Sequence, residues 1–101
     1  MLSTTAVNCF ELYYGAYRSK QKDTNLTATR AALRRLVVLD LTEESSKEAG
    51  QILASLDEKG STIGFRDALI AAIARIHKMT LATGDSEHFS RVAGLQILKA
   101  P

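Results

Sequence analysis

The sequence predicts an α/β protein in which a parallel sheet is flanked by helices. Short apolar runs rich in β-branched residues alternate with amphipathic stretches, and one longer stretch is apolar on every side. Helices that alternate with short buried strands are typical of a parallel sheet. The 101 residues are 46% hydrophobic and 24% charged, which is the composition of a globular protein, and we expect one domain over residues 1–101.

The first third of the chain predicts two helices. We expect the first over residues 3–19, capped by Ser3 or Thr4, with Phe10 in its core-facing side. The apolar face of this helix consists of Ala6, Phe10, Tyr13 or Tyr14, and Tyr17. One of the tyrosines could instead lie in a partly hydrated dimer interface, which suits a ring with a polar hydroxyl. We expect the second helix from about 24 to 35, with an inward face of Ala28, Ala32, Leu33 and Leu36.

A strand and a third helix follow. Residues 36–41 are almost continuously apolar, which predicts a strand buried on both faces. Thr42 is placed to cap the next helix, and Gly60 stands where a helix-ending glycine belongs. The inward stripe of this helix consists of Ala49, Ile52, Leu53 and Leu56.

The most apolar stretch lies at residues 65–78 and predicts a helix that is buried all round. We expect short strands at 80–83 and 95–98, with one helical turn at 86–90 between them. No apolar run reaches the roughly 18 residues of a membrane span. A single cysteine and the lack of a secretory leader predict a reduced, cytoplasmic setting.

Charge is unevenly distributed along the chain, although the net charge is only +2. Six basic residues and one acid lie between Arg18 and Arg35, whereas acids dominate between Asp40 and Glu58. The pattern fits either two solvated helix faces or, on the basic side, a patch that binds nucleic-acid phosphates.

Three carboxylates stand out by position: Glu11 within the first helix, Asp67 at the start of the buried helix, and Asp85 just after a strand. Ligands of parallel α/β sheets bind beyond the carboxyl ends of strands. Clustered carboxylates repel one another, and Mg²⁺ or Mn²⁺ would relieve the repulsion and activate water for phosphodiester cleavage. Alternatively, Asp67 and Asp85 cap helices and Glu11 pairs with a basic neighbour.

The order of several motifs resembles a PIN domain, and most closely the VapC-type toxins of prokaryotic toxin–antitoxin pairs. The residues that carry the resemblance are Glu11-Leu12-Tyr13-Tyr14-Gly15, Val37-Val38-Leu39-Asp40-Leu41, Asp67-Ala68-Leu69-Ile70-Ala71-Ala72-Ile73-Ala74, and Thr83-Gly84-Asp85 with His88-Phe89. The resemblance covers nearly the whole chain.

The resemblance implies a metal-dependent endoribonuclease with a parallel sheet and an acidic pocket. It implies that Asp67 and Asp85 are direct ligands of Mg²⁺ or Mn²⁺, that Glu11 positions water, and that Thr83 is the pocket hydroxyl. It further implies an RNA substrate, an antitoxin partner and a homodimer.

The chain departs from the family pattern at its start. The family begins with a strand that carries an Asp, and Asp23-Thr24-Asn25 resembles that motif but follows no apolar strand. We therefore expect an N-terminally truncated PIN domain that lacks one strand–helix–strand unit, leaving strand 36–41 and the two later strands with no neighbour to join them.

Two further interpretations stay open at this point. The chain could be a catalytically impaired PIN-like module that is retained for dimerisation or antitoxin binding. It could also be a receiver-like or flavodoxin-like domain, although the acid pair and phosphate loop of those folds are not visible.

Overall fold

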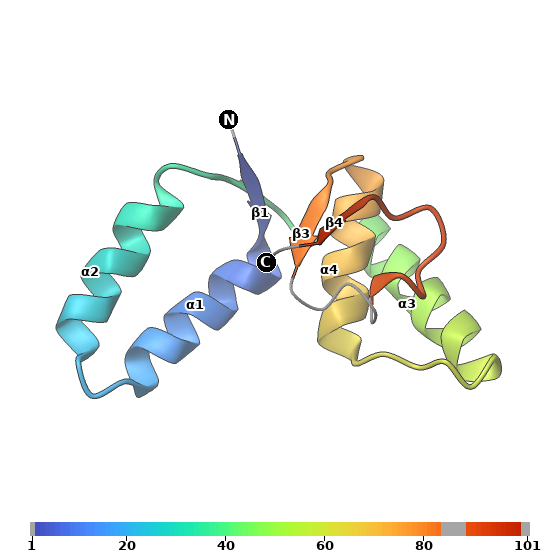
Figure 1. Cartoon of the computed structure of the whole chain (residues 1–101), viewed down its shortest axis with the longest axis horizontal. Helices are drawn as coiled ribbons and strands as arrows, with labels where there is room; N and C mark the ends of the chain where they lie inside the picture. The colour runs from blue at the N-terminus through green and yellow to red at the C-terminus, as the bar shows by residue number, and fades with distance from the viewer. Residues whose placement is uncertain (1, 84–88, 100–101) are drawn as a thin grey trace. The chain divides into compact units, whose positions relative to one another are not determined.

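A computed structural model of the chain describes residues 2–83 and 89–99. The chain falls into two compact units, Met1–Asp40 and Leu41–Pro101 (Figure 1), and each contains two of the helices and two of the strands that the structure describes. Both strand pairs are parallel, so the α/β class with parallel pairing is confirmed. The strands described form two two-stranded sheets, one within each unit, rather than one continuous sheet.

The first unit is built from β1 (Ser3–Thr5), α1 (Ala6–Arg18), α2 (Lys22–Leu33) and β2 (Val37–Leu39). The two helices lie side by side as a hairpin that connects the two paired strands along the chain (Figure 1). The register matches Ser3 to Val37 and Thr5 to Leu39. The predicted helix start at residue 3 is wrong, because Ser3–Thr5 pair with β2 and Thr5 becomes the N-cap, accepting a hydrogen bond from the Asn8 N–H at 3.1 Å.

Burial in the first unit also differs from the prediction. Phe10 is 62% exposed and Tyr14 is 52% exposed, so Phe10 is not a core residue. The side of α1 that is buried carries the smaller Val7 and Ala16, because two helices and two short strands enclose little space. On α2, Leu33 is buried as predicted and Leu36 just beyond it is half-buried, whereas Ala28 and Ala32 are exposed.

Strand β2 is not buried on both faces, as its apolar sequence had suggested. Val37 is 43% exposed and Val38 is 37% exposed. Within its unit the strand pairs only with β1, so its second edge has no partner among the described residues. The apolar β-branched run therefore predicted the strand correctly, but the burial expected for its side chains was too high.

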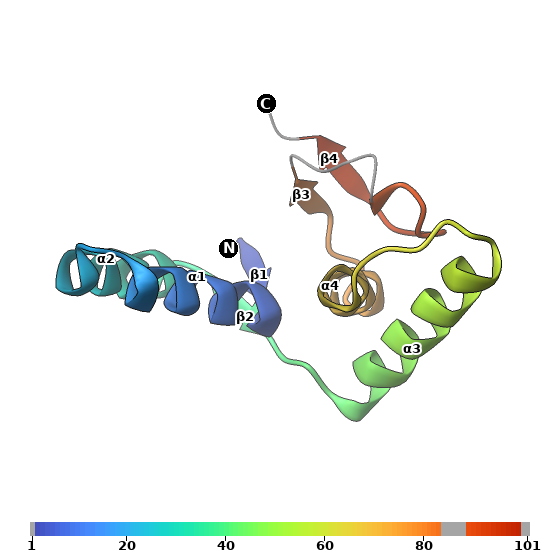
Figure 2. The ribbon, with the colours of Figure 1, turned by 90° about the horizontal axis from the view of Figure 1, so that it is seen from below.

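The second unit is built from α3 (Glu43–Glu58), α4 (Phe65–Ile76), β3 (Leu81–Thr83) and β4 (Ile97–Lys99). Figure 2 shows α4 end-on, with α3 on one side and the β3–β4 pair on another. Strand β3 begins one residue after its predicted start and ends where predicted, whereas β4 begins two residues and ends one residue after its predicted bounds. The helical turn predicted for residues 86–90 lies mostly outside the described residues.

Helix α3 begins and ends where the sequence predicts. Thr42 forms a capping box with Ser45, since each side chain accepts a hydrogen bond from the other residue's backbone N–H. At the other end Gly60 has φ +70°, and the N–H groups of Gly60 and Ser61 bind the carbonyls of Asp57 and Leu56. This is a Schellman motif, in which glycine removes the strain of the left-handed position.

The core of the second unit centres on α4. Ala71, Ala72, Ile73 and Ala74 are 0% exposed, which confirms the predicted buried helix. The stripe of α3 packs against it, with Ala49, Ile52 and Leu56 buried and Leu53 half-buried. The alanines allow the α3 backbone to approach closely, so the start of α4 is held by a well-packed helix pair.

Candidate functional site

The start of α4 holds the acid that the sequence singled out most clearly. The N-cap is Gly64, which has no side chain to cap the helix, and Asp67 is the acid in the first turn. Asp67 is half-buried, and the N-terminal end of the helix dipole favours a negative charge at this place. Because the N-cap position belongs to Gly64, Asp67 is not the N-cap of its helix.

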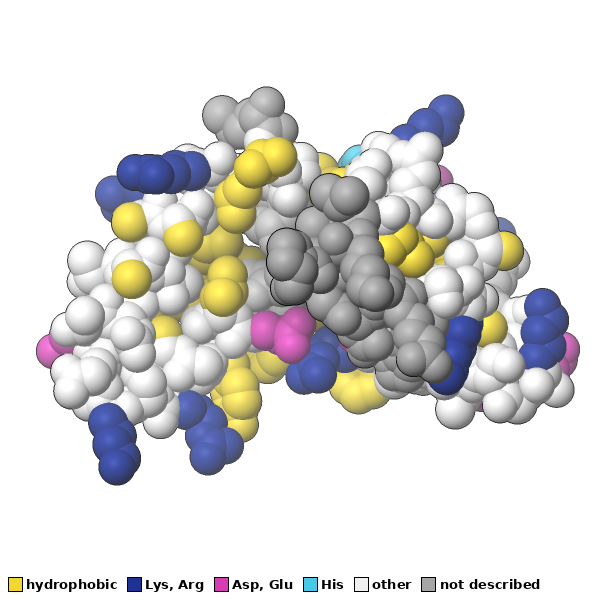
Figure 3. Space-filling model, viewed as in Figure 1, with side chains coloured by type: hydrophobic (Ala, Val, Ile, Leu, Met, Phe, Trp, Pro, Cys, Tyr) yellow, Lys and Arg dark blue, Asp and Glu magenta, His cyan; other side chains and the backbone are white. Residues whose placement is uncertain are grey.

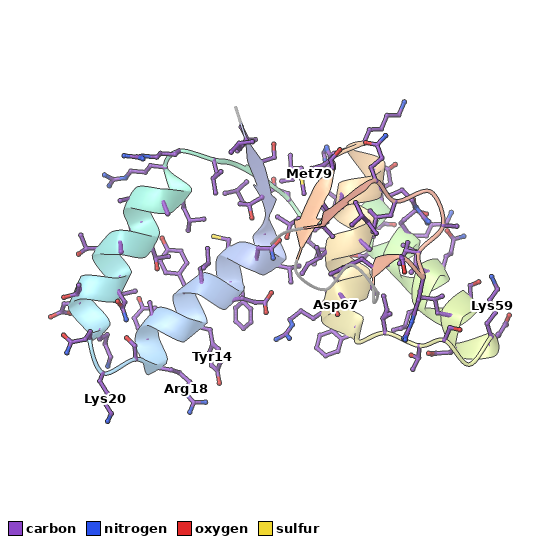
Figure 4. All side chains as sticks on the ribbon, in the orientation of Figure 1. Tyr14, Arg18, Lys20, Lys59, Asp67 and Met79 are labelled. Carbon is purple, nitrogen blue, oxygen red and sulfur yellow. The ribbon has the colours of Figure 1, made fainter. Side chains whose placement is uncertain are left out.

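A shallow pocket of about 180 Å³ opens beside this turn, lined by Gly64, Phe65, Arg66 and Asp67. Phe65 is 72% exposed, so an apolar ring stands next to the carboxylate. Figure 4 shows Asp67 at the first turn of α4. Arg66 lines this pocket but was not among the predicted site residues, and its position directly before Asp67 is the signal that could have identified it.

Thr83 is the last residue of β3, opposite Lys99 of β4 in the parallel register. It therefore stands at the carboxyl end of its strand, the edge at which parallel sheets bind ligands. Asp85 follows two residues later in the sequence and lies outside the described residues.

Glu11 lies on α1 in the first unit and is half-buried. Within residues 2–83 and 89–99, no group of three or more His, Cys, Asp or Glu side chains is arranged to hold a metal ion. The structure thus places Asp67 in a helix first turn and Thr83 at a strand end, and the joining of Glu11, Asp67, Thr83 and Asp85 into one metal site stays a prediction.

The basic stretch of the sequence forms the surface of the α1–α2 hairpin and the turn after it. Lys and Arg side chains project from both ends of this hairpin in Figure 3. Arg18 stacks over the Tyr14 ring at 5.7 Å from its centroid and donates a hydrogen bond to the Tyr14 hydroxyl at 3.0 Å. Exposed cations beside an exposed aromatic ring can contact both the phosphates and the bases of a nucleic acid.

Comparison with known proteins agrees with the motif order. The family model of the PIN domain matches residues 1–95. The chain is 34% identical over 92 residues to the tRNA(fMet)-specific endonuclease VapC of Shigella flexneri, covering 91% of this chain and 70% of that protein. It is 33% identical over 95 residues to Ribonuclease VapC2 of Haemophilus influenzae strain KW20, covering 94% of this chain and 72% of the relative.

Solved structures show the same relationship. The fold matches a chain in the crystal structure of VapBC2 from Rickettsia felis bound to a DNA fragment from their promoter, with a TM-score of 0.92 and 29% identity. That match covers 98% of this chain and 74% of the other. None of the helices among the described residues is long and apolar enough to cross a membrane. The family match spans most of the sequence and the relatives exceed 30% identity, so this chain belongs to the PIN-domain family.

Proposed function

We propose that this chain is an endoribonuclease, the toxin component of a prokaryotic toxin–antitoxin pair. The observation that carries the proposal is the PIN-domain match over residues 1–95 together with relatives named as VapC ribonucleases. The alternative of a non-catalytic module is not favoured, because these relatives are named for nuclease activity. The family match runs through both compact units, which supports a single PIN-like domain over residues 1–101.

We assign the metal site to the acids that the motifs identify. Asp67 and Asp85 would hold Mg²⁺ or Mn²⁺, and Glu11 would orient water through its carboxylate. The carboxylate of the half-buried Asp67 in the first turn of α4 supports this, since hard divalent cations prefer oxygen ligands. When bound, the cation would promote deprotonation of water and offset the negative charge of the phosphodiester.

The remaining residues of the site have binding roles. The hydroxyl of Thr83, at the carboxyl end of β3, would donate a hydrogen bond to a phosphate oxygen or to water. The cations of the α1–α2 hairpin would attract the RNA backbone without regard to sequence, so RNA affinity should fall as salt rises.

The partners follow from the same family. The relative from Rickettsia felis was crystallised as VapBC2 on promoter DNA, which supports a cognate antitoxin for this chain. An Arg of that antitoxin could pair with the acids of the site, because guanidinium and carboxylate groups form two parallel hydrogen bonds. We further propose a homodimer that acts on RNA in the cytoplasm.

The decisive experiment is cleavage of a labelled RNA by the purified chain with Mn²⁺, with and without EDTA. Asp67→Asn should reduce the rate by at least about a hundredfold. Glu44→Gln is the matched control, because Glu44 also occupies a helix first turn but lies on the exposed side of α3. Cleavage that survives both EDTA and Asp67→Asn would refute the proposal. Calorimetric titration with Mn²⁺ should show saturable binding that Asp67→Asn weakens.

A further inference from the structure

A second pocket lies in the unit Leu41–Pro101, apart from the turn that carries Asp67. It has a volume of about 150 Å³ and lies between α3, the later part of α4 and the segment 91–93. Three cationic side chains line it: Lys59 from the end of α3, Arg75 from α4, and Arg91. None of the residues that line it is acidic, and none belongs to the proposed metal site.

Two of the three cations are held in place by the fold. The Arg75 guanidinium forms an ion pair with Glu48 at 3.0 Å and donates a hydrogen bond to the Ala93 carbonyl at 2.7 Å. The Arg91 guanidinium donates to the Thr62 carbonyl at 2.9 Å. A guanidinium has five N–H donors, so both arginines keep further donors for a ligand after these bonds. Because their positions are already fixed, little side-chain entropy is lost when an anion binds.

The side-chain ammonium of the third cation, Lys59, forms no hydrogen bond or ion pair with another described residue, although its backbone N–H binds the Ser55 carbonyl at 3.3 Å. Figure 4 shows it at the end of α3. Glu48 balances one positive charge, and the last carbonyls of α3 contribute about half a negative charge. The pocket therefore keeps a net positive charge. Its polar lining also includes Ser55, whose hydroxyl can donate to an anion.

We propose that this pocket binds a phosphate group. Its volume is several times the roughly 30 Å³ that one water molecule occupies in the liquid, which is enough room for a tetrahedral oxyanion. Two arginines match phosphate geometry because their planar forks donate paired hydrogen bonds, and Lys59 adds a mobile point charge. The phosphate comes either from an RNA backbone, which rests on the function proposed above, or from a free nucleotide or inorganic phosphate.

The test is calorimetric titration of the purified chain with inorganic phosphate and with adenosine 5′-monophosphate, in EDTA and at constant ionic strength. Wild type should bind saturably, and Lys59→Glu should weaken binding by about tenfold or more. Lys47→Glu is the matched control, because it makes the same charge change on an exposed part of α3 outside the pocket. Circular dichroism checks that both variants fold.

Binding that is absent in wild type, or equally weak in Lys59→Glu and Lys47→Glu, would overturn the proposal. A separate arm measures the affinity of a 5′-labelled twelve-nucleotide RNA in EDTA, where no cleavage occurs. If Lys59→Glu lowers RNA affinity and the salt slope relative to Lys47→Glu, the RNA backbone is the source of the phosphate. If only the small anions lose affinity, the pocket takes a free phosphate. Asp67→Asn should leave phosphate binding intact, which separates this site from the nuclease site.

Discussion

Replacing Lys78 by glycine should stabilise the protein, although the substitution removes a side chain and adds no contact. Helix α4 ends in a turn in which the Met79 N–H binds the Ala74 carbonyl at 2.8 Å and the Lys78 N–H binds the Arg75 carbonyl at 3.2 Å. This is the same Schellman motif that Gly60 closes on α3. Here the left-handed position is held by a lysine with φ +54°.

The size of the effect follows from two opposing terms. An L-residue in the left-handed region costs roughly 1–2 kcal/mol, and glycine there avoids most of this cost. Glycine loses more backbone entropy on folding, which offsets roughly 0.5–1 kcal/mol. Lys78 is exposed, so no packing is lost. We expect a net gain of roughly 0.5–1 kcal/mol in the free energy of unfolding, or about 2–4 °C in Tm for a chain of this size.

The measurement is urea and thermal unfolding followed by circular dichroism. Lys47→Gly is the matched control, because Lys47 is an exposed residue within α3, where glycine should instead destabilise by about 0.5–1 kcal/mol. Opposite signs for the same chemical change would identify backbone conformation as the cause. If Lys78→Gly is no more stable than wild type while Lys47→Gly behaves as expected, the left-handed turn at Lys78 does not limit stability.

Substitutions at three further positions test the fold by unfolding in urea. Gly60→Ala should destabilise by about 1 kcal/mol through backbone strain alone, since a Cβ at this position would meet nothing within 4 Å; an unchanged midpoint would contradict this. Thr42→Ala should lose about 1 kcal/mol because it removes the cap of α3, and Thr42→Ser should restore most of it. Ile73→Ala should cost roughly 2–5 kcal/mol because Ile73 is fully buried, whereas a cost below about 1 kcal/mol would argue against the α4 core.

The parts of the fold that the sequence predicted well are those determined by neighbouring residues. Helix α3 is the clearest case, since its cap, its apolar stripe and its terminal glycine all lie within one short segment. The end of α4 was less accurate, because a lysine in a left-handed turn carries no signal that distinguishes it from an ordinary helical residue.

The errors concern burial and strand pairing, which depend on distant segments. Ser3–Thr5 have residues that suit a helix cap, yet they form β1 because β2 supplies a parallel partner. Phe10 and Val37 are apolar, yet they are exposed because their unit has too few elements to cover them. An apolar residue indicates where burial is favourable, but the neighbouring elements decide whether it happens.

The candidate sites show the same difference between features set by neighbouring residues and features that need distant segments. The first-turn position of Asp67 and the strand-end position of Thr83 depend on local sequence, and both were predicted from it. A metal site needs acids from several segments, so only the order of family motifs suggested which ones to combine. The cationic pocket shows the same dependence, because Lys59, Arg75 and Arg91 are separated in sequence and are brought to one cavity by the packing of α3 and α4. Its ligand therefore has to be identified by charge reversal at Lys59, where a change in phosphate affinity can be measured without relying on nuclease activity.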